Sequence, residues 1–338
     1  MASVPVASEI EVLDLRHFSA RQLRPLLERE AGVWRERLRW DYSNSTELLL
    51  QYLESRILQG FVALDQGRVC GYTFCVYEGT KAVIGDAFAM GHRTMSDAAA
   101  TRALLVPMLE LLRHTPGIER VESQLLLFDA GDFAELFAGP EYTLYPRLFL
   151  ECDFGAQRET LAARAVEMQA DLTGVPAELE LSLWRAEDYQ AAGELIYLCY
   201  VGHTDAQIND QYRSLHGSLR FLHNIVRFPG CGVFEARFSW MLRERQSGAL
   251  VGMVLCSRVG EKVAHITQLC VAQAYRGRGL GRELLVRSAQ SLLDAGFDAI
   301  TLTVTEGNDP AVRLYERFGF TQLHRFDAMV LDTRFKRP

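Results

Sequence analysis

The 338-residue sequence has no long hydrophobic run, no excess of positive charge and no paired-cysteine motif. No apolar stretch approaches the roughly 20 residues that a helix needs to cross a bilayer. Residues 1–5 lack the basic region and apolar core of a signal peptide. The formal net charge of −7 argues against a dedicated nucleic-acid binder, which usually carries a strongly basic surface. We therefore expect a cytoplasmic protein without membrane or nucleic-acid partners.

The cysteines are odd in number and scattered, mostly within apolar runs. None of them forms a CxxC pair or a Cys/His spacing typical of metal ligands. This pattern predicts free, buried thiols in a reducing compartment and no metal cofactor. The seven are Cys70, Cys75, Cys152, Cys199, Cys231, Cys256 and Cys270.

The composition is that of a globular protein, with 49% hydrophobic and 23% charged residues. At roughly 150 residues per domain, the length favours two domains. A mostly polar helical run at 157–172, closed by Gly174 and Pro176, predicts a linker over 156–176. The expected domains are therefore 8–155 and 177–338.

Both halves show one order of elements, which suggests duplication. In the first half we expect strands at 10–15, 61–65, 68–77, 82–89, 121–128 and 142–153, and helices at 20–38, 46–58, 98–113 and 133–137. In the second half we expect strands at 178–184, 232–245, 249–259, 263–272, 299–305 and 320–332, and helices at 186–201, 206–226, 279–295 and 309–318. The segments 71–73 and 252–254 occupy matching places, as do 149–153 and 328–332.

The most informative segment is a glycine-rich turn between a strand and a helix, Arg276-Gly277-Arg278-Gly279-Leu280-Gly281-Arg282. Glycines let the backbone approach a ligand, and the N–H groups at a helix start bind anions. Three arginines add positive charge, so the turn suits a phosphate or pyrophosphate. It lacks the lysine of a P-loop. It also follows the fourth strand of its half, whereas a dinucleotide-binding fingerprint follows the first.

Arg276-x-x-Gly279-x-Gly281 resembles the Arg/Gln-x-x-Gly-x-Gly/Ala signature of the GNAT superfamily of acyl-CoA-dependent N-acyltransferases. Asn308, Ala311 and the block 314–320 are similar to that family's second motif. The resemblance covers about 264–320, with Gln273 where many members have proline. The rest of the second half fits the family's element order, and the first half fits only by topology. The resemblance implies an α/β (α+β) fold of two tandem GNAT-like domains, each a mixed, mostly antiparallel sheet flanked by helices.

The resemblance also implies that acetyl-CoA is the cosubstrate. The N–H groups of 277–282 would hold the pyrophosphate. A bulged strand ending at Val271 would splay from its neighbour and admit the pantetheine arm beside Leu269 and Val271. The N–H of Val271 would donate to the thioester oxygen. The implied cofactor-binding residues are Leu269, Cys270, Val271, Arg276, Gly277, Arg278, Gly279, Leu280, Gly281, Arg282, Asn308, Ala311 and Tyr315.

Three side chains are candidates for proton transfer. Tyr315 could protonate the leaving thiolate or simply pack on the core. His265 could accept the proton of the acceptor amine, since strand alternation puts it on the side of Leu269 and Val271, or it could be structural. Glu235 is the reserve base, with an outward-facing carboxylate as its other interpretation. Asn308 could cap a helix, bond the pantetheine, or do both.

The first copy lacks these motifs. Residues 90–97 hold one glycine, and 133–139 hold no hydroxyl where the tyrosine block should lie. We expect a degenerate copy that does not bind coenzyme A catalytically. His92 and Arg93 could contact an anion or lie in a solvated loop.

We therefore expect an N-acetyltransferase that moves acetyl directly from acetyl-CoA to a primary amine. A coenzyme-A-binding regulator without turnover and an inert scaffold are the alternatives. Tandem members of the family include mycothiol synthases, so the amine of a small thiol precursor is one possible acceptor. Protein termini, lysines, amino-sugars and polyamines are others. The sequence carries no signal for oligomeric state.

Overall fold

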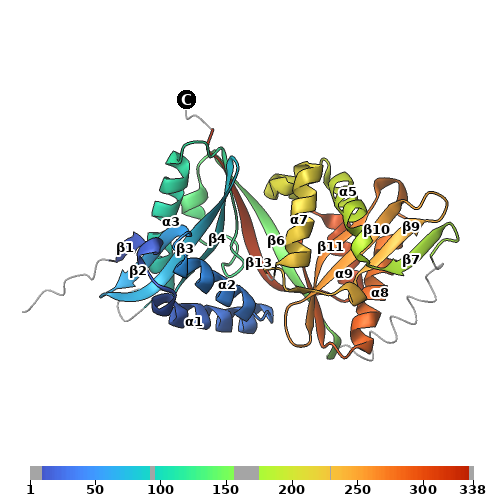
Figure 1. The fold of residues 1–338 in the computed structure, drawn as a ribbon, viewed down its shortest axis with the longest axis horizontal. Coiled ribbons are helices and arrows are strands. Elements are labelled where there is room, and N and C mark those ends of the chain that lie inside the picture. The colour runs from blue at the N-terminus through green and yellow to red at the C-terminus, as the bar shows by residue number, and fades with distance from the viewer. Residues whose placement is uncertain (1–9, 92–95, 156–174, 229, 335–338) are drawn as a thin grey trace, which may run out of the picture. The chain divides into compact units, whose positions relative to one another are not determined.

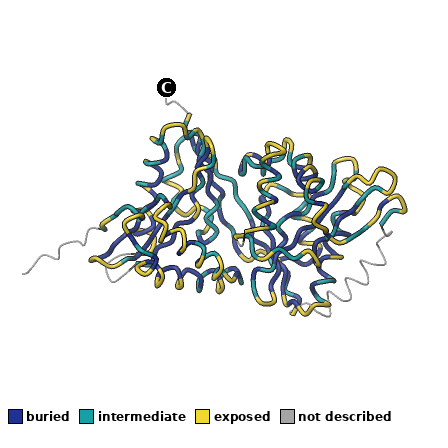
Figure 2. The backbone as a smooth tube through the Cα atoms, in the orientation of Figure 1, coloured by how far each residue is buried: buried dark blue, intermediate teal, exposed yellow. Residues whose placement is uncertain are grey.

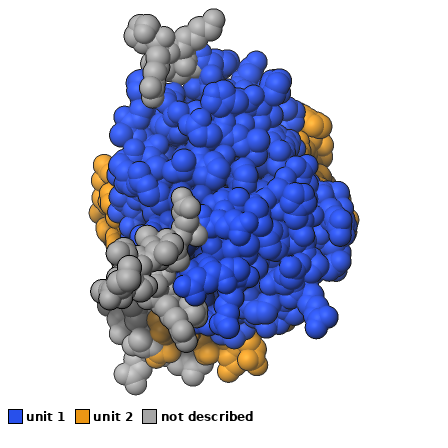
Figure 3. All heavy atoms as spheres, turned by 90° about the vertical axis from the view of Figure 1, so that its left-hand side faces the viewer, with its two compact units in different colours: residues 1–35, 42–145, 326–338 blue, residues 36–41, 146–325 orange. Residues whose placement is uncertain are grey.

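The computed structural model describes residues 10–91, 96–155, 175–228 and 230–334 (Figure 1). The predicted linker helix at 157–172, His92 and Arg93 lie outside these ranges. The chain forms two compact units that interleave along the sequence, coloured separately in Figure 3. Unit 1 takes residues 1–35, 42–145 and 326–338, and unit 2 takes residues 36–41 and 146–325. The predicted domains, 8–155 and 177–338, describe the two copies in the sequence, whereas the compact units are discontinuous in sequence. These domain boundaries stay a prediction.

The elements of unit 1 are β1 (Glu11–Asp14), α1 (Ala20–Leu38), α2 (Ser43–Glu54), β2 (Gln59–Asp65), β3 (Arg68–Glu78), β4 (Lys81–Ala89), α3 (Asp97–His114) and β5 (Arg120–Gln124). Those of unit 2 are β7 (Leu179–Leu183), α5 (Tyr189–Tyr200), α6 (Asp205–Ile208), α7 (Leu215–Arg227), β8 (Val233–Phe234), β9 (Trp240–Glu244), β10 (Leu250–Arg258), β11 (Val263–Val271), α8 (Leu280–Asp294), β12 (Ala299–Thr305) and α9 (Asp309–Phe318). Two long strands, β6 (Tyr142–Asp153) and β13 (Thr321–Asp332), have residues in both units.

Each unit has a mixed, mostly antiparallel sheet, as predicted. In unit 1 the order is β1-β2-β3-β4-β5-β13, with only the β4–β5 pair parallel. In unit 2 the order is β6-β12-β11-β10-β9-β7, with only β11–β12 parallel and β8 beside β10. The single parallel pair in each sheet is joined by a helix, α3 or α8, as a parallel crossover requires.

The last strand of the first half of the sequence, β6, belongs to the sheet of unit 2. The last strand of the second half, β13, belongs to the sheet of unit 1. β6 pairs with β12, with Leu148 opposite Val304. β13 pairs with β5, with Met329 opposite Ser123. Each sheet is therefore completed by a strand from the other half of the chain.

A β-bulge at an equivalent place in both sheets supports the duplication. On β11, Thr267 is left unpaired between Ile266 and Gln268. On β4, Gly85 is left unpaired in the same way. Because a bulge reverses the alternation of side chains, His265 lies on the opposite face from Leu269 and Val271. The prediction that these three share a face was wrong, since a bulge is set by strand pairing and not by composition.

The bulge is followed by the splay that the family resemblance implies. The parallel pairing of β11 and β12 runs from Val263–Ala299 to Ile266–Leu302 and then stops. Both strands continue beyond that point, so the edge of β11 facing β12 carries unpaired backbone groups between Thr267 and Val271.

Figure 2 shows that much of the unit 2 sheet is buried, and separate hydrophobic cores cover its two faces. Leu284 and Leu285 of α8 pack on one face with Val254 and Ile300. On the other face, α5 and α7 pack against residues that include Met253, Leu255 and Cys270. The bulge therefore decides which core each residue of β11 joins.

Two predicted elements of unit 2 are broken. The helix expected at 206–226 is interrupted before α7, where Ser214 is extended and its hydroxyl accepts the N–H of Gly217 at 3.0 Å. The strand expected at 232–245 is split by a turn in which the Ser239 hydroxyl donates to the Glu235 carbonyl. In both places a serine hydroxyl bonds the backbone, and this competes with the regular ladder.

Candidate active site

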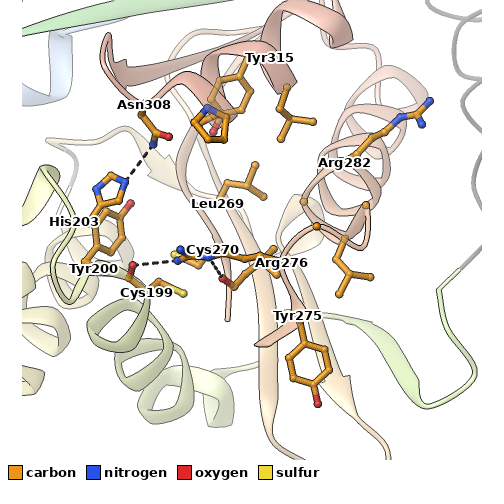
Figure 4. A pocket seen from close by; sticks show the side chains of 18 residues that line it. Cys199, Tyr200, His203, Leu269, Cys270, Tyr275, Arg276, Arg282, Asn308 and Tyr315 are labelled. Carbon is orange, nitrogen blue, oxygen red and sulfur yellow. Dashed lines mark hydrogen bonds between the residues drawn. The ribbon is translucent and has the colours of Figure 1, made fainter. Parts of the chain in front are cut away.

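A cavity of about 580 Å³ opens in unit 2 where β11 and β12 separate (Figure 4). Its walls come from the end of β11, the glycine loop, the starts of α8 and α9, and the end of α5. The lining residues are Cys199, Tyr200, His203, Leu269, Cys270, Val271, Tyr275, Arg276, Gly277, Gly279, Leu280, Gly281, Arg282, Asn308, Pro310, Ala311, Leu314 and Tyr315. Every predicted cofactor-binding residue except Arg278 is among them.

The glycine loop ends in a helix start that no side chain of the described residues caps. Gly277 and Gly279 both have φ of 76°, in the left-handed region. A Cβ at either position would meet no atom within 4 Å, so the backbone conformation, not space, favours glycine there. The first N–H groups of α8 remain for a ligand, and the helix dipole favours an anion at that point.

The three arginines of the loop have different partners. Arg276 Nε donates to the Val271 carbonyl at 3.0 Å, and its Nη2 donates to the Cys199 carbonyl at 3.2 Å, so it ties the loop to α5. Arg278 is ion-paired with Glu178. Arg282 lines the cavity and has no ion pair with any residue in the described part of the chain. It is therefore the arginine best placed to meet a phosphate.

The backbone of β11 offers donors to the cavity. The N–H of Ala272 bonds across to Val251 on β10. Because donors alternate along a strand, the N–H groups of Leu269 and Val271 face the opposite, unpaired edge. A ligand can bond there as an added strand would.

Tyr315 enters the cavity from α9, although it is only 8% exposed. Its ring packs on Phe320 at a centroid distance of 5.7 Å. Burial, with smaller contributions from Cys270 and Asp205, raises the pKa of Tyr315 above its usual range. The phenol therefore keeps its proton at neutral pH and can donate it, and it also packs on the core.

His265 lies outside the cavity lining. Its Nδ1 is 2.8 Å from Thr301 Oγ1, and its ring centroid lies 5.0 Å from that of Trp40 and 5.7 Å from that of Phe149. Burial lowers the pKa of His265 to about 3, so the ring is neutral at physiological pH. These contacts support the structural interpretation of His265 over the role of base.

Glu235 also lies away from the cavity. Its carboxylate bonds Arg237 and Arg258, both at 3.1 Å, beside a separate surface pocket. Its ion pairs with the two arginines favour a structural role for Glu235 over the role of base.

No sequence pattern predicted the wall formed by Cys199, Tyr200 and His203. Tyr200 donates to Gln268 Oε1 at 3.1 Å, and His203 Nε2 lies 3.3 Å from the side-chain nitrogen of Asn308. These residues lie at and after the end of α5, and only tertiary packing brings them to the cavity. Asn308 occupies the cap position of α9, but its side chain makes no capping bond.

Two negative findings hold within the described ranges. No helix there is long and apolar enough to cross a membrane. No group of three or more His, Cys, Asp or Glu side chains in those ranges could hold a metal ion.

Comparison with known proteins points to one family. The model described as Acetyltransferase (GNAT) family matches residues 208–320. A mycothiol acetyltransferase of Corynebacterium aurimucosum is 49% identical over 51 residues, which are 15% of this chain and 17% of that protein. An N-alpha-acetyltransferase of Arabidopsis thaliana is 30% identical over 102 residues, which are 27% of this chain and 54% of that protein.

The fold comparison extends over nearly the whole chain. A tandem GNAT protein from the clavulanic acid biosynthesis pathway aligns with a TM-score of 0.58 and 15% identity, over 97% of this chain and 100% of that one. The architecture is therefore the fold of that tandem protein. Residues 208–320 are therefore similar in sequence to the GNAT acetyltransferase family. The matched segments span less than two thirds of either curated relative.

Proposed function

We propose that unit 2 transfers an acetyl group directly from acetyl-CoA to a primary amine. One observation carries the proposal. A single cavity brings together an uncapped helix start, the open edge of β11 and a protonated tyrosine. These groups match, in order, a pyrophosphate, an extended amide-containing arm and a leaving thiolate.

In the proposed reaction, the neutral amine attacks the thioester carbonyl carbon. The C–N bond forms, and the negative charge on the carbonyl oxygen is met by the N–H of Val271. The C–S bond then breaks, and Tyr315 gives its proton to the departing thiolate, whose pKa is near 8.5. The amine loses its surplus proton to solvent, and Tyr315 is reprotonated from solvent.

The first copy is proposed to be degenerate. Its counterpart of the tyrosine block is a short 3-10 helix, Ala134–Phe137, which has no hydroxyl side chain. One molecule of coenzyme A should therefore bind per chain, which isothermal titration calorimetry measures directly.

The acceptor is an unidentified amine. The names of the relatives suggest two classes for a panel, small thiol-precursor amines and peptide N-termini. Release of free thiol from acetyl-CoA in the presence of each amine tests the proposal. Turnover with at least one amine supports it. Tight coenzyme A binding without thiol release would instead favour a coenzyme-A-binding regulator.

A further inference from the structure

The side chains of His203 and Asn308 meet at one end of the cavity, and Arg282 lies at the other end (Figure 4). His203 follows α5, and Asn308 precedes α9, so the pair joins two walls of the site (Figure 4). His203 Nε2 lies 3.3 Å from the side-chain nitrogen of Asn308. Neither residue is isolated from solvent, and both line the cavity.

The other ring nitrogen of His203 fixes the position of its proton. The backbone N–H of Asp205 donates to His203 Nδ1 at 3.1 Å. The Asp205 carboxylate lies farther away, at 3.9 Å from Nδ1, and accepts a bond from Thr305. Because Nδ1 is an acceptor, a neutral His203 carries its proton on Nε2. The nitrogen that faces Asn308 is therefore a donor.

A donor at Nε2 requires an oxygen opposite it. The oxygen and nitrogen of an asparagine amide are distinguished by their hydrogen bonds, not by their positions. The favourable arrangement turns the Asn308 oxygen toward His203, which leaves the amide N–H₂ for the cavity. Among the described residues the Asn308 side chain caps no N–H group of α9, because the N–H groups of Ala311 and Val312 bond its backbone carbonyl instead.

We propose that His203 is a positioning residue that orients the Asn308 amide so that its N–H₂ group donates into the cavity. The acceptor for that donor is a carbonyl oxygen of the acyl-CoA arm. This inference rests on the proposed function, and it assigns His203 a role that contacts no reacting atom.

Two substitutions of His203 separate the two ring nitrogens. A glutamine amide reaches the place of Nε2, whereas an asparagine amide reaches only the place of Nδ1. His203→Gln should keep the Kd for coenzyme A within about twofold. His203→Asn should raise that Kd, and the KM for acetyl-CoA, about five- to tenfold, the usual effect of one lost hydrogen bond. The kcat should change little in either variant.

Substitutions of Asn308 test the direction of the amide. Asn308→Asp keeps an oxygen for His203 but removes the N–H₂ donor, so it should weaken coenzyme A binding at least as much as Asn308→Ala. In the Asn308→Ala background, His203→Asn should have no further effect on the Kd. Wild-type affinity in Asn308→Asp would overturn the proposal.

The tautomer can be measured without any ligand. The ¹⁵N chemical shifts of labelled histidine, assigned with the His203→Gln variant, should show Nε2 protonated and Nδ1 bare. A protonated Nδ1 in the neutral ring would overturn the inference. If the wild-type chain binds coenzyme A but His203→Asn binds it equally well, only this inference fails. A wild-type chain that binds no coenzyme A overturns the proposed function itself.

Discussion

The Tyr72 hydroxyl donates a hydrogen bond to Glu30 Oε2 at 2.7 Å in the interior of unit 1. Glu30 is fully buried, and Asp86, which accepts a bond from Tyr42, lies beside it. Burial and the neighbouring Asp86 raise the pKa of Glu30 well above its usual value. The two acids form a buried pair, and the raised pKa of Glu30 leads us to expect that it keeps its proton when the chain folds.

This pair predicts that unit 1 loses stability as the pH rises. The unfolded chain releases the Glu30 proton near pH 4.5, whereas the folded chain retains it to a higher pH. The stabilisation is therefore complete below pH 4.5 and falls above it, by about 1.4 kcal/mol per pH unit for one proton. Glu30→Gln should flatten this slope and stabilise the protein at pH 7. Urea unfolding between pH 5 and 8 measures it.

The matched control is Glu28→Gln, on the same helix, because Glu28 is 61% exposed. It should leave the pH dependence unchanged. An equal slope for Glu30→Gln and the wild type would show that the pair is not protonated in the folded state.

Gly279→Ala should lower both stability and coenzyme A affinity. No atom blocks the new methyl group, so the cost comes from φ of 76° and amounts to about 1 kcal/mol. A backbone that relaxes to a negative φ would turn the anion-binding N–H groups away. Thermal unfolding and calorimetric titration with coenzyme A check the two effects.

The control is Gly32→Ala, in an unstrained and open position of α1, which should have the opposite effect on stability. Unchanged coenzyme A binding in Gly279→Glu would contradict the loop assignment.

Tyr315→Phe should reduce kcat by about 10²- to 10⁴-fold, the usual contribution of a general acid. The ring contact with Phe320 is preserved, so the unfolding temperature should stay within a few degrees. Steady-state kinetics with a fixed amine measures the loss. Since the pKa of Tyr315 is raised, wild-type activity should not fall through loss of this proton below pH 10. A kcat unchanged by the substitution would leave Tyr315 with a packing role alone.

His265 should affect stability and not proton transfer. Its folded pKa of about 3 is below the ordinary value of 6.5, so its stabilising effect is full above pH 6.5 and is lost as the pH falls toward 3. His265→Ala should cost about 2–4 kcal/mol, because it leaves a space between Trp40 and Phe149. His265→Asn keeps a donor toward Thr301 and should preserve the pH–rate profile near neutrality. A profile that loses its lower pKa in this variant would restore His265 as the base.

Periodicity and turn residues correctly predicted those elements whose ends are set by residues adjacent in the sequence. The helices Ala20–Leu38 and Asp309–Phe318 and the strand Ala299–Thr305 have the bounds expected from periodicity and from capping or turn residues. The glycine loop and Tyr315 line one cavity, and two short contiguous motifs in the sequence had pointed to both. The resemblance implied a bulge in this strand, but its position at Thr267 was not predicted, since that position depends on the register with β10.

The parts of the site that were missed depend on contacts between distant segments. Asn308 and His203 are 105 residues apart, and no spacing rule links a turn after one helix to the start of another. The burial of His265 depends on Trp40 and Phe149, from the first half of the sequence. Only the folded chain shows that this histidine is enclosed by aromatic rings.

The exchange of β6 and β13 makes each half of the chain an incomplete folding unit. A fragment of residues 177–338 would lack β6 and leave β12 with a bare edge, which invites aggregation. The first half alone would lack β13 beside β5. Two fragments cut within 156–174 should therefore be insoluble apart and regain structure when produced together. Neither copy can be deleted without exposing a strand edge of the other, so retention of the first copy requires no chemistry of its own.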